Sequence, residues 1–232
     1  MRLAEDRWLA ERLGRPAFTV HDVSDLESPL PPHLAPGFYQ ARVPAERVDV
    51  IRALQPAGFY VASAGITLAR PPGGYDGASG VEVATADPAR DAALLDVAES
   101  SFHASRFHLD PQIAPEVANR IKRDWVASYL GNTRGEELLA ARADGAPVGF
   151  LAVIAGEAHG RPIRTIDLIA VSPRHRGSGA GAALVARFLA DSVGRCDEVR
   201  VGTQGANPGA TRFYERLGFT AVATAYDLHL HV

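Results

Sequence analysis

Thiols and lysines are almost absent from this chain of 232 residues. Cys196 is its only cysteine and Lys122 its only lysine, although Lys and Arg together number 24. One cysteine excludes a disulfide framework within the chain and a multi-thiolate zinc site. The cations are therefore nearly all arginines, which suit bidentate contacts to phosphate.

Two further absences narrow the class of protein. No window approaches about 18 uninterrupted apolar residues, and residues 1–14 alternate charged and apolar side chains, so we expect neither a membrane span nor a signal peptide. The net charge of −3 argues against a nucleic-acid partner, because phosphate backbones select positive surfaces. With 47% hydrophobic and 22% charged residues the chain is typical of folded proteins, and we expect a cytoplasmic one.

A segment rich in proline and glycine divides the chain. Residues 71–80 hold two prolines and four glycines, which continue neither a helix nor a central strand. We predict an N-terminal subdomain over 1–70, a linker over 71–80 and a larger domain over 81–232. Residues 29–36 are also proline-rich and predict a loop.

Strands and helices alternate on both sides of this linker. Before it we predict helices at 3–13 and 48–54, and strands at 17–23, 37–43 and 59–69. After it we predict strands at 81–85, 137–143, 147–156, 164–171, 198–203 and 220–230, and helices at 88–102, 115–130, 179–192 and 208–217. This order indicates a layered α/β (α+β) fold. Residues 53–59 and 213–219 both predict a helix that ends in Gly-Phe before a strand; this favours a degenerate half-copy in the N-terminal part, or chance, since glycine commonly ends helices.

Residues 168–188 carry the strongest chemical signal. An apolar strand leads through Arg174 into Arg176-Gly177-Ser178-Gly179-Ala180-Gly181 and a helix. Glycines let backbone N–H groups approach a ligand, and the helix N-terminus adds a positive dipole end, so the turn suits a phosphate or pyrophosphate. A dinucleotide site fits poorly, because four residues separate the strand from Gly177, and a loop without a ligand is a further alternative. No Gly-Lys-Ser/Thr occurs, which excludes a P-loop.

This turn resembles the R/Q-x-x-G-x-G/A signature of the GCN5-related N-acetyltransferases (GNAT superfamily). Residues 207–219 resemble that family's N-x-x-A-x-x-F-Y-x-x-x-G-F signature, in matching order and spacing. The resemblance covers about residues 81–232 and implies the GNAT fold, a mostly antiparallel mixed sheet with two splayed central strands that admit acetyl-CoA. The cofactor contacts that it implies are Ile169, Ala170, Val171, Arg176, Gly177, Ser178, Gly179, Ala180, Gly181 and Asn207.

Catalytic candidates follow from the same resemblance. Tyr214 matches the family's tyrosine and becomes the expected general acid toward the CoA thiolate, since a phenol is protonated at neutral pH; packing in a helical stripe is the alternative. Asp167, a carboxylate in an apolar strand, is a candidate general base or a strand-edge acid held by Arg164. Many family members carry the base near Thr165, where this chain has no carboxylate. Asn207 is expected to contact CoA, to cap its helix, or both.

Several other segments resemble one branch, the bacterial dTDP-fucosamine N-acetyltransferases. They are Ser105-Arg106-Phe107-His108, Val201-Gly202-Thr203-Gln204, Tyr226-x-Leu228 and residues 55–59. This resemblance implies a dTDP-linked 4-amino-4,6-dideoxyhexose as the acceptor, contacted by Ser105, Arg106 and His108. Another small amine, a protein N-terminus, and a non-catalytic acyl-CoA-binding module are the alternatives. We expect no metal, because no ligand set accompanies His103 and His108, and the apolar last strand suggests pairing in a homodimer.

Overall fold

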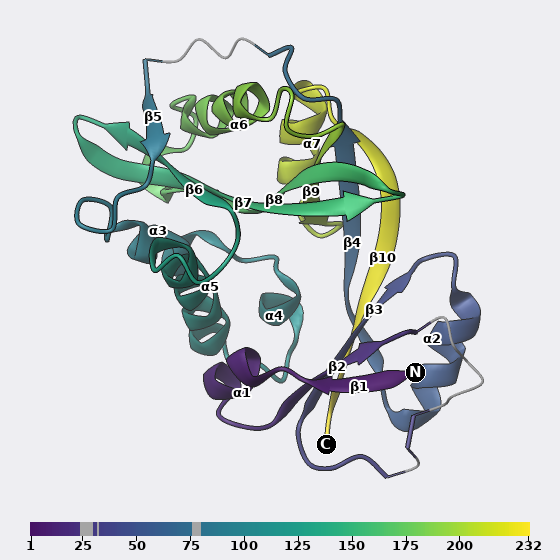
Figure 1. The fold of residues 1–232 in the computed structure, drawn as a ribbon. Helices are drawn as coiled ribbons and strands as arrows, with labels where there is room; N and C mark the ends of the chain where they lie inside the picture. Colours follow the sequence, from purple (N-terminus) through teal and green to yellow (C-terminus); the bar gives the residue numbers. More distant parts are fainter. Residues whose placement is uncertain (24–29, 32, 76–79) are drawn as a thin grey trace.

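The computed structural model describes residues 1–23, 30, 31, 33–75 and 80–232 (Figure 1). In this part of the chain ten strands form one mixed sheet in the order β1-β2-β3-β10-β4-β9-β8-β7-β6-β5. The strands are β1 Arg2–Glu5, β2 Ala17–His21, β3 Phe38–Pro44, β4 Tyr60–Arg70, β5 Glu82–Thr85, β6 Glu137–Ala143, β7 Ala146–Ala158, β8 Arg161–Val171, β9 Glu198–Gln204 and β10 Thr220–His231. The helices are α1 Arg7–Leu13, α2 Val48–Leu54, α3 Leu94–Ser101, α4 Arg106–Leu109, α5 Pro115–Leu130, α6 Ala180–Asp191 and α7 Pro208–Arg216, with the 3-10 turns η1 Gln55–Ala57 and η2 Pro173–His175.

Helices cover both faces of the sheet, as the layered fold class requires (Figure 1). On one face α6 and α7 bury Leu184, Phe188 and Tyr214 against the central strands. On the other face α3 and α5 pack Leu94 and Val126 against β6, β7 and β8. No helix among the described residues combines the length and the apolar character that a membrane crossing requires.

Two predicted helices begin later than expected. Residues 2–5 form β1, paired with β2, and α1 begins only after Asp6, whose carboxylate accepts a hydrogen bond from the Leu9 amide at 2.9 Å. Residues 88–93 form turns, so the predicted start of α3 at Pro88 was wrong. The physical reason is Asp91, which is fully buried and accepts a hydrogen bond from Arg142 Nε at 3.1 Å. The turns at 88–93 keep this buried ion pair, and breaking it to extend the helix to Pro88 would leave a buried charge without its partner.

The strands of the N-terminal part belong to the same sheet as those of the C-terminal part. β4 lies between β9 and β10, and Ala225–His229 of β10 pairs with β3 on its other side. This stretch of the last strand is thus interior, so the predicted pairing of that strand across a homodimer is not available to it. The division at 71–80 stays a prediction, since residues 76–79 lie outside the described part, as do 29 and 32 of the predicted loop.

The two helix–Gly–strand segments have the expected local structure. Gly58 and Gly218 adopt φ angles of 96° and 82°, which an L side chain rarely adopts, and they lead into β4 and β10. Phe59 and Phe219 are both buried directly after the glycines. The two strands pair with each other antiparallel, from Thr220 with Ala69 to His229 with Tyr60, so the two similar segments lead into opposite ends of one central strand pair.

Candidate active site

Two central strands separate partway along their length. β8 and β9 pair in parallel from Ile163 with Glu198 to Ile166 with Val201, and no pair follows among the described residues. Each strand stays paired on its outer side, β8 with β7 up to Val171 and β9 with β4 up to Gln204. The inner edges beyond this point therefore keep free backbone groups facing a gap, which confirms the expected splayed strands.

The gap opens into a cavity of about 740 Å³. It is walled by the end of β8, the glycine turn, the start of α6, and α7, with residues 101–105 on the opposite side. Residues predicted for the site that line it are Ser105, Ile169, Ala170, Val171, Arg176, Gly177, Gly179, Ala180, Gly181, Asn207 and Tyr214. Eleven of the fifteen candidates thus meet in one place; Ser178, Asp167, Arg106 and His108 are not among its lining residues.

The glycine turn has the backbone geometry of an anion cradle. Gly177 and Gly179 adopt φ angles of 81° and 88°, and Gly179 occupies the position before the first residue of α6. A Cβ at Gly181 would lie 3.4 Å from the Phe213 ring, which is an ordinary contact, so the packing of α6 beside α7 does not itself require glycine there. Arg176 spans the cavity mouth and donates to the Ser101 carbonyl at 3.2 Å. Ser178 serves the turn itself, because its Oγ accepts from the Ala180 amide at 3.4 Å.

Tyr214 lies on α7, and its side chain forms part of the cavity wall. Its side chain is only 4% exposed, and burial raises the pKa of this phenol above its ordinary value. It makes edge contacts with Phe213 and Phe219, and its hydroxyl has no hydrogen-bond partner among the described residues. A protonated donor without a partner is thus available to a group in the cavity, while the ring also packs as the helical stripe predicts.

Asn207 caps α7. Its Oδ1 accepts from the Ala210 amide at 3.1 Å, and Pro208 follows at the first helical position. The predicted cap is confirmed. Asn207 also lines the cavity, so a contact to CoA stays open as a prediction.

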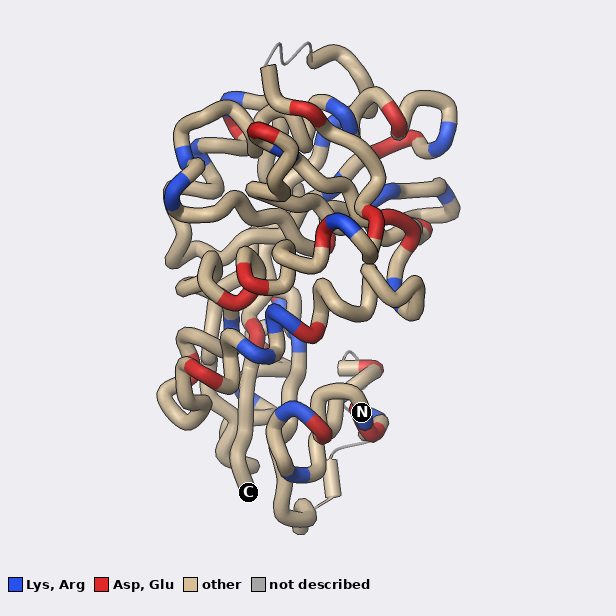
Figure 2. The backbone as a smooth tube through the Cα atoms, turned by 90° about the vertical axis from the view of Figure 1, so that its left-hand side faces the viewer, with Lys and Arg blue, Asp and Glu red and all other residues tan. Residues whose placement is uncertain are grey.

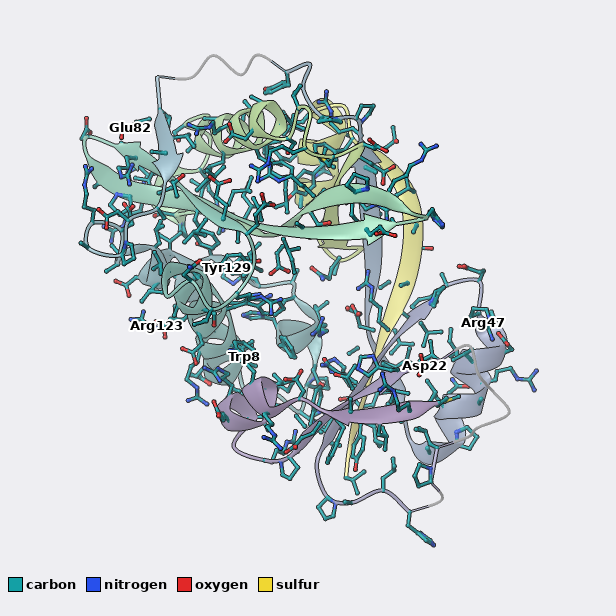
Figure 3. All side chains as sticks on the ribbon, viewed as in Figure 1. Trp8, Asp22, Arg47, Glu82, Arg123 and Tyr129 are labelled. Carbon is teal, nitrogen blue, oxygen red and sulfur yellow. The ribbon has the colours of Figure 1, made fainter. Side chains whose placement is uncertain are left out.

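Asp167 is held by three donors. Its Oδ2 accepts from Trp125 Nε1 at 2.9 Å, from the Tyr129 hydroxyl at 2.7 Å and from Arg134 Nε at 3.1 Å. Figure 3 labels Tyr129, which extends from α5 toward the sheet. Asp167 sits at a register shift between β7 and β8, where one extra residue turns its side chain toward α5. The carboxylate is committed to these donors, and its role as a base stays an untested prediction.

Arg164 is not the partner of Asp167. Its Nε donates to Glu136 at 3.0 Å and its Nη1 to Ser192 at 2.8 Å. The predicted ion pair of Asp167 with Arg164 was therefore wrong; the cation that pairs with Asp167 is Arg134. Strand alternation explains why Arg164 does not reach Asp167. The two residues are three positions apart, so their side chains point to opposite faces of the sheet.

The predicted acceptor residues around α4 separate into two groups. Ser105 Oγ contacts His108 Nδ1 at 2.6 Å, and His108 Nε2 contacts Asn119 Oδ1 at 2.9 Å, so this histidine joins α4 to α5. Burial lowers the pKa of His108 and keeps its ring neutral at neutral pH. Arg106 points elsewhere and lines a second, smaller cavity.

Known proteins resemble a large part of this chain. The profile of the acetyltransferase (GNAT) family matches residues 95–219, more than half of the chain. The spore coat polysaccharide biosynthesis protein SpsD of Bacillus subtilis is 31% identical over 197 residues, which cover 83% of this chain and 66% of that protein. The mycothiol acetyltransferase of Tsukamurella paurometabola is 31% identical over 190 residues, covering 72% and 61%. The chain thus spans about two thirds or less of these relatives' lengths.

A solved structure gives the same result for the fold. The crystal structure of a GCN5-related N-acetyltransferase from Sphaerobacter thermophilus has a TM-score of 0.56 at 19% identity, over 85% of this chain and 60% of that one. At this identity the likeness concerns the fold alone. With the family profile, it is clear that the chain belongs to the GNAT family of acetyltransferases, as its two signatures indicated.

Proposed function

We propose that this GNAT-family enzyme transfers an acetyl group from acetyl-CoA directly to the amine of a nucleotide-linked amino-deoxysugar. The observation that carries the transferase part is the 740 Å³ cavity, in which the glycine turn, the free edge of β8 and Tyr214 face one space. The name of the Bacillus subtilis relative, a polysaccharide biosynthesis protein, supports a sugar acceptor.

The lining residues fit the parts of acetyl-CoA. Backbone amides at the start of α6, together with Arg176, suit the pyrophosphate, because they combine orphan donors with positive charge. The unpaired edge around Ile169 and Val171 suits the amides of the pantetheine arm, which can add to it as a further strand. Phe213 and Ala210 supply apolar walls.

The chemistry needs no covalent enzyme intermediate. The acceptor nitrogen attacks the thioester carbonyl, the C–N bond forms and the C–S bond breaks. Tyr214 donates its phenolic proton to the departing thiolate, which becomes a thiol with a pKa of about 8.5, and the proton that the amine loses restores the Tyr214 phenol through water. Cys196 is buried against α6, where its Sγ contacts the Ser192 carbonyl at 3.7 Å, and it does not line the cavity.

The test is a thioester-consumption assay with a panel of amines. The panel includes dTDP-linked 4-amino-4,6-dideoxyhexoses, the free amino sugars, polyamines, amino acids, aminoglycosides and the acceptor substrate of the mycothiol acetyltransferases. We expect turnover with the dTDP-linked sugars at the highest kcat/KM. Binding of acetyl-CoA without turnover on any amine contradicts the proposal and favours a non-catalytic acyl-CoA-binding module. Preference for the substrate of the mycothiol acetyltransferases, the second candidate given the 31% identity, contradicts the acceptor only.

A further inference from the structure

Buried polar atoms without partners gather at two places in the described part of the chain. Five buried side-chain atoms have no hydrogen-bond partner there: Gln40 Oε1, Ser101 Oγ, Arg106 Nε, His175 Nδ1 and His229 Nε2. Ser101 and His175 line the large cavity. The other three residues line a second cavity of about 120 Å³. Native proteins pair almost all such atoms, so their concentration at cavities points to ligands.

The second cavity lies where the N-terminal strands meet α4 and β10. Its walls come from β2, β3, α4 and β10, with Thr19, Gln40, Ala41, Arg42, Arg106, Asp227 and His229 as lining residues. Its volume matches about four water molecules, which is room for a phosphate group and an adjoining hydroxyl.

Arg106 is the uncompensated charge of this cavity. It makes no hydrogen bond and no ion pair with any described residue, and its guanidinium stacks only on Phe107 at 4.6 Å. Burial lowers the pKa of Arg106, and Asp227 offsets part of this effect. Asp227, however, already pairs with Arg42 Nη1 at 3.0 Å and accepts from Ser63 Oγ at 2.6 Å. Among the lining residues two arginines therefore face one carboxylate, and the Asp6 carboxylate, which accepts from Gln40 Nε2 at 3.4 Å, lies beside the cavity.

His229 adds a polar atom of defined character. The ring is fully buried, and its Nδ1 donates to Asp110 Oδ2 at 2.6 Å, which leaves Nε2 as a hydrogen-bond acceptor. The same Asp110 oxygen contacts His231 Nε2 at 2.9 Å, so these three side chains hold one another in place. Gln40 Oε1 is a second free acceptor, since the Gln40 amide donates to Thr19 Oγ1 at 3.0 Å.

The two cavities adjoin along two paths. Ser105 lines the large cavity and Arg106, the next residue, lines the small one. Arg42 lies over Gly65, where a Cβ would meet its Nη2 at 2.9 Å, and Gly65 pairs with Gln204 at the wall of the large cavity. A ligand that reaches both cavities can thus place a reacting amine at one end and an anion at the other.

We propose that the small cavity is the acceptor's phosphate subsite: Arg106 and Arg42 bind a phosphate of the nucleotide-linked sugar, and His229 and Gln40 accept hydrogen bonds from a hydroxyl next to it. This inference rests on the proposed function, and it adds residues from β3 and β10 that lie outside both GNAT signatures. Guanidinium groups match phosphate oxygens in geometry and charge, and the free acceptors match the hydroxyls that adjoin phosphates in a nucleotide sugar. One ligand then pairs all three orphaned atoms.

Steady-state kinetics with matched acceptors test the subsite. A dTDP-linked 4-amino-4,6-dideoxyhexose is compared with the methyl glycoside of the same amino sugar, which lacks phosphate. Arg106→Gln raises the KM for the dTDP-linked acceptor by roughly 10- to 100-fold and leaves the KM of the methyl glycoside and kcat within about 2-fold. Arg106→Lys recovers part of the loss. Arg52→Gln, which removes an exposed cation from α2, changes neither KM.

A second variant tests Arg42 without removing charge. Gly65→Ala crowds the Arg42 guanidinium, whose far end can shift, so the fold is retained while the subsite is displaced. We expect a smaller rise in the same KM, with an unchanged circular dichroism melting curve. Equal KM changes for both acceptors in Arg106→Gln, or none, overturn the proposal.

Calorimetric binding of dTDP separates this proposal from the proposed function. The protein is first saturated with CoA, so that the large cavity does not bind the probe. If dTDP binds the wild type, and binds Arg106→Gln at least about tenfold more weakly, the result supports the subsite even where no amine is acetylated. If dTDP binds both proteins equally, or binds neither, the subsite is refuted even where amino sugars are acetylated. Pyrophosphate and malonate are then tested as competitors of dTDP on the wild type. If malonate displaces dTDP as well as pyrophosphate does, the phosphate site is also refuted.

Discussion

Lys122 is a buried cation without a counterion, and its replacement by methionine has a predictable consequence. The chain's single lysine lies on α5 at 7% exposure, with its Nζ over the rings of Trp125 at 4.6 Å and Phe102 at 5.1 Å. It has no ion pair among the described residues, and burial, followed by the nearby Arg106, lowers its pKa to about 7. Methionine fills similar space with no charge to desolvate.

The magnitude follows from linkage between protonation and folding. An unfolded lysine has a pKa of about 10.5, so a folded pKa of about 7 corresponds to at most about 5 kcal/mol at 1.36 kcal/mol per pH unit. Below pH 7 both states hold the proton, and the wild type bears the full cost of the buried charge. Between pH 7 and 10.5 the unfolded state binds more protons, so the stability of the wild type rises toward that of Lys122→Met.

Urea unfolding of both proteins at pH 6, 7, 8 and 9 measures this difference. We expect Lys122→Met to be the more stable protein at pH 6 by about 2–5 kcal/mol, and the gap to shrink steadily above pH 7. Arg120→Met, which removes an exposed cation from the same helix, is the control and gives a pH-independent difference. Because the chain has one lysine, labelling that residue also gives a single ε-ammonium NMR signal. A gap that stays constant from pH 6 to 9, or a titration midpoint near 10, refutes the reasoning.

Three further substitutions test the candidate site. Tyr214→Phe should lower kcat by roughly 10²–10⁴ and leave the Kd of acetyl-CoA nearly unchanged; wild-type turnover contradicts the general-acid role. Gly179→Ala forces an L side chain to a φ of 88°, so calorimetry should show weaker CoA binding and a melting temperature lower by about 2–4 °C; unchanged values contradict the cradle. Asp167→Asn should cost about 1–3 kcal/mol of stability, through its three donors, without altering the pH profile of kcat; a roughly 100-fold fall in kcat instead identifies Asp167 as the base.

Contiguous signals explain which parts of the site were predictable. The turn from Arg176 to Gly181 and the segment from Asn207 to Tyr214 each encode a complete local structure, and they line the cavity as expected. The positive φ angles at the glycines and the Asn-Pro cap depend on single residues and their immediate neighbours, so they can be predicted from a short stretch of sequence.

The second cavity had no such contiguous signal. Arg42, Arg106 and His229 come from three elements that meet only because β10 inserts between β3 and β4, and no local pattern encodes strand order. The spacing His229-x-His231 was available, since it places both rings on one face of a strand. The charge distribution gave no hint either, because basic and acidic residues are interspersed over the backbone (Figure 2).

The sheet order also explains how a gap between β8 and β9 exists in a folded protein. Backbone groups that leave a ladder must find other partners, so splayed strands in isolation would fray. Here β7 holds β8 through the pair of Gly149 with Val171, and β4 holds β9 through the pair of Gly65 with Gln204. β4 comes from the N-terminal part of the chain, so residues outside the family signatures keep one wall of the gap in place. The free inner edges belong to the folded ground state, and a ligand that pairs with them has no strand contact to break first.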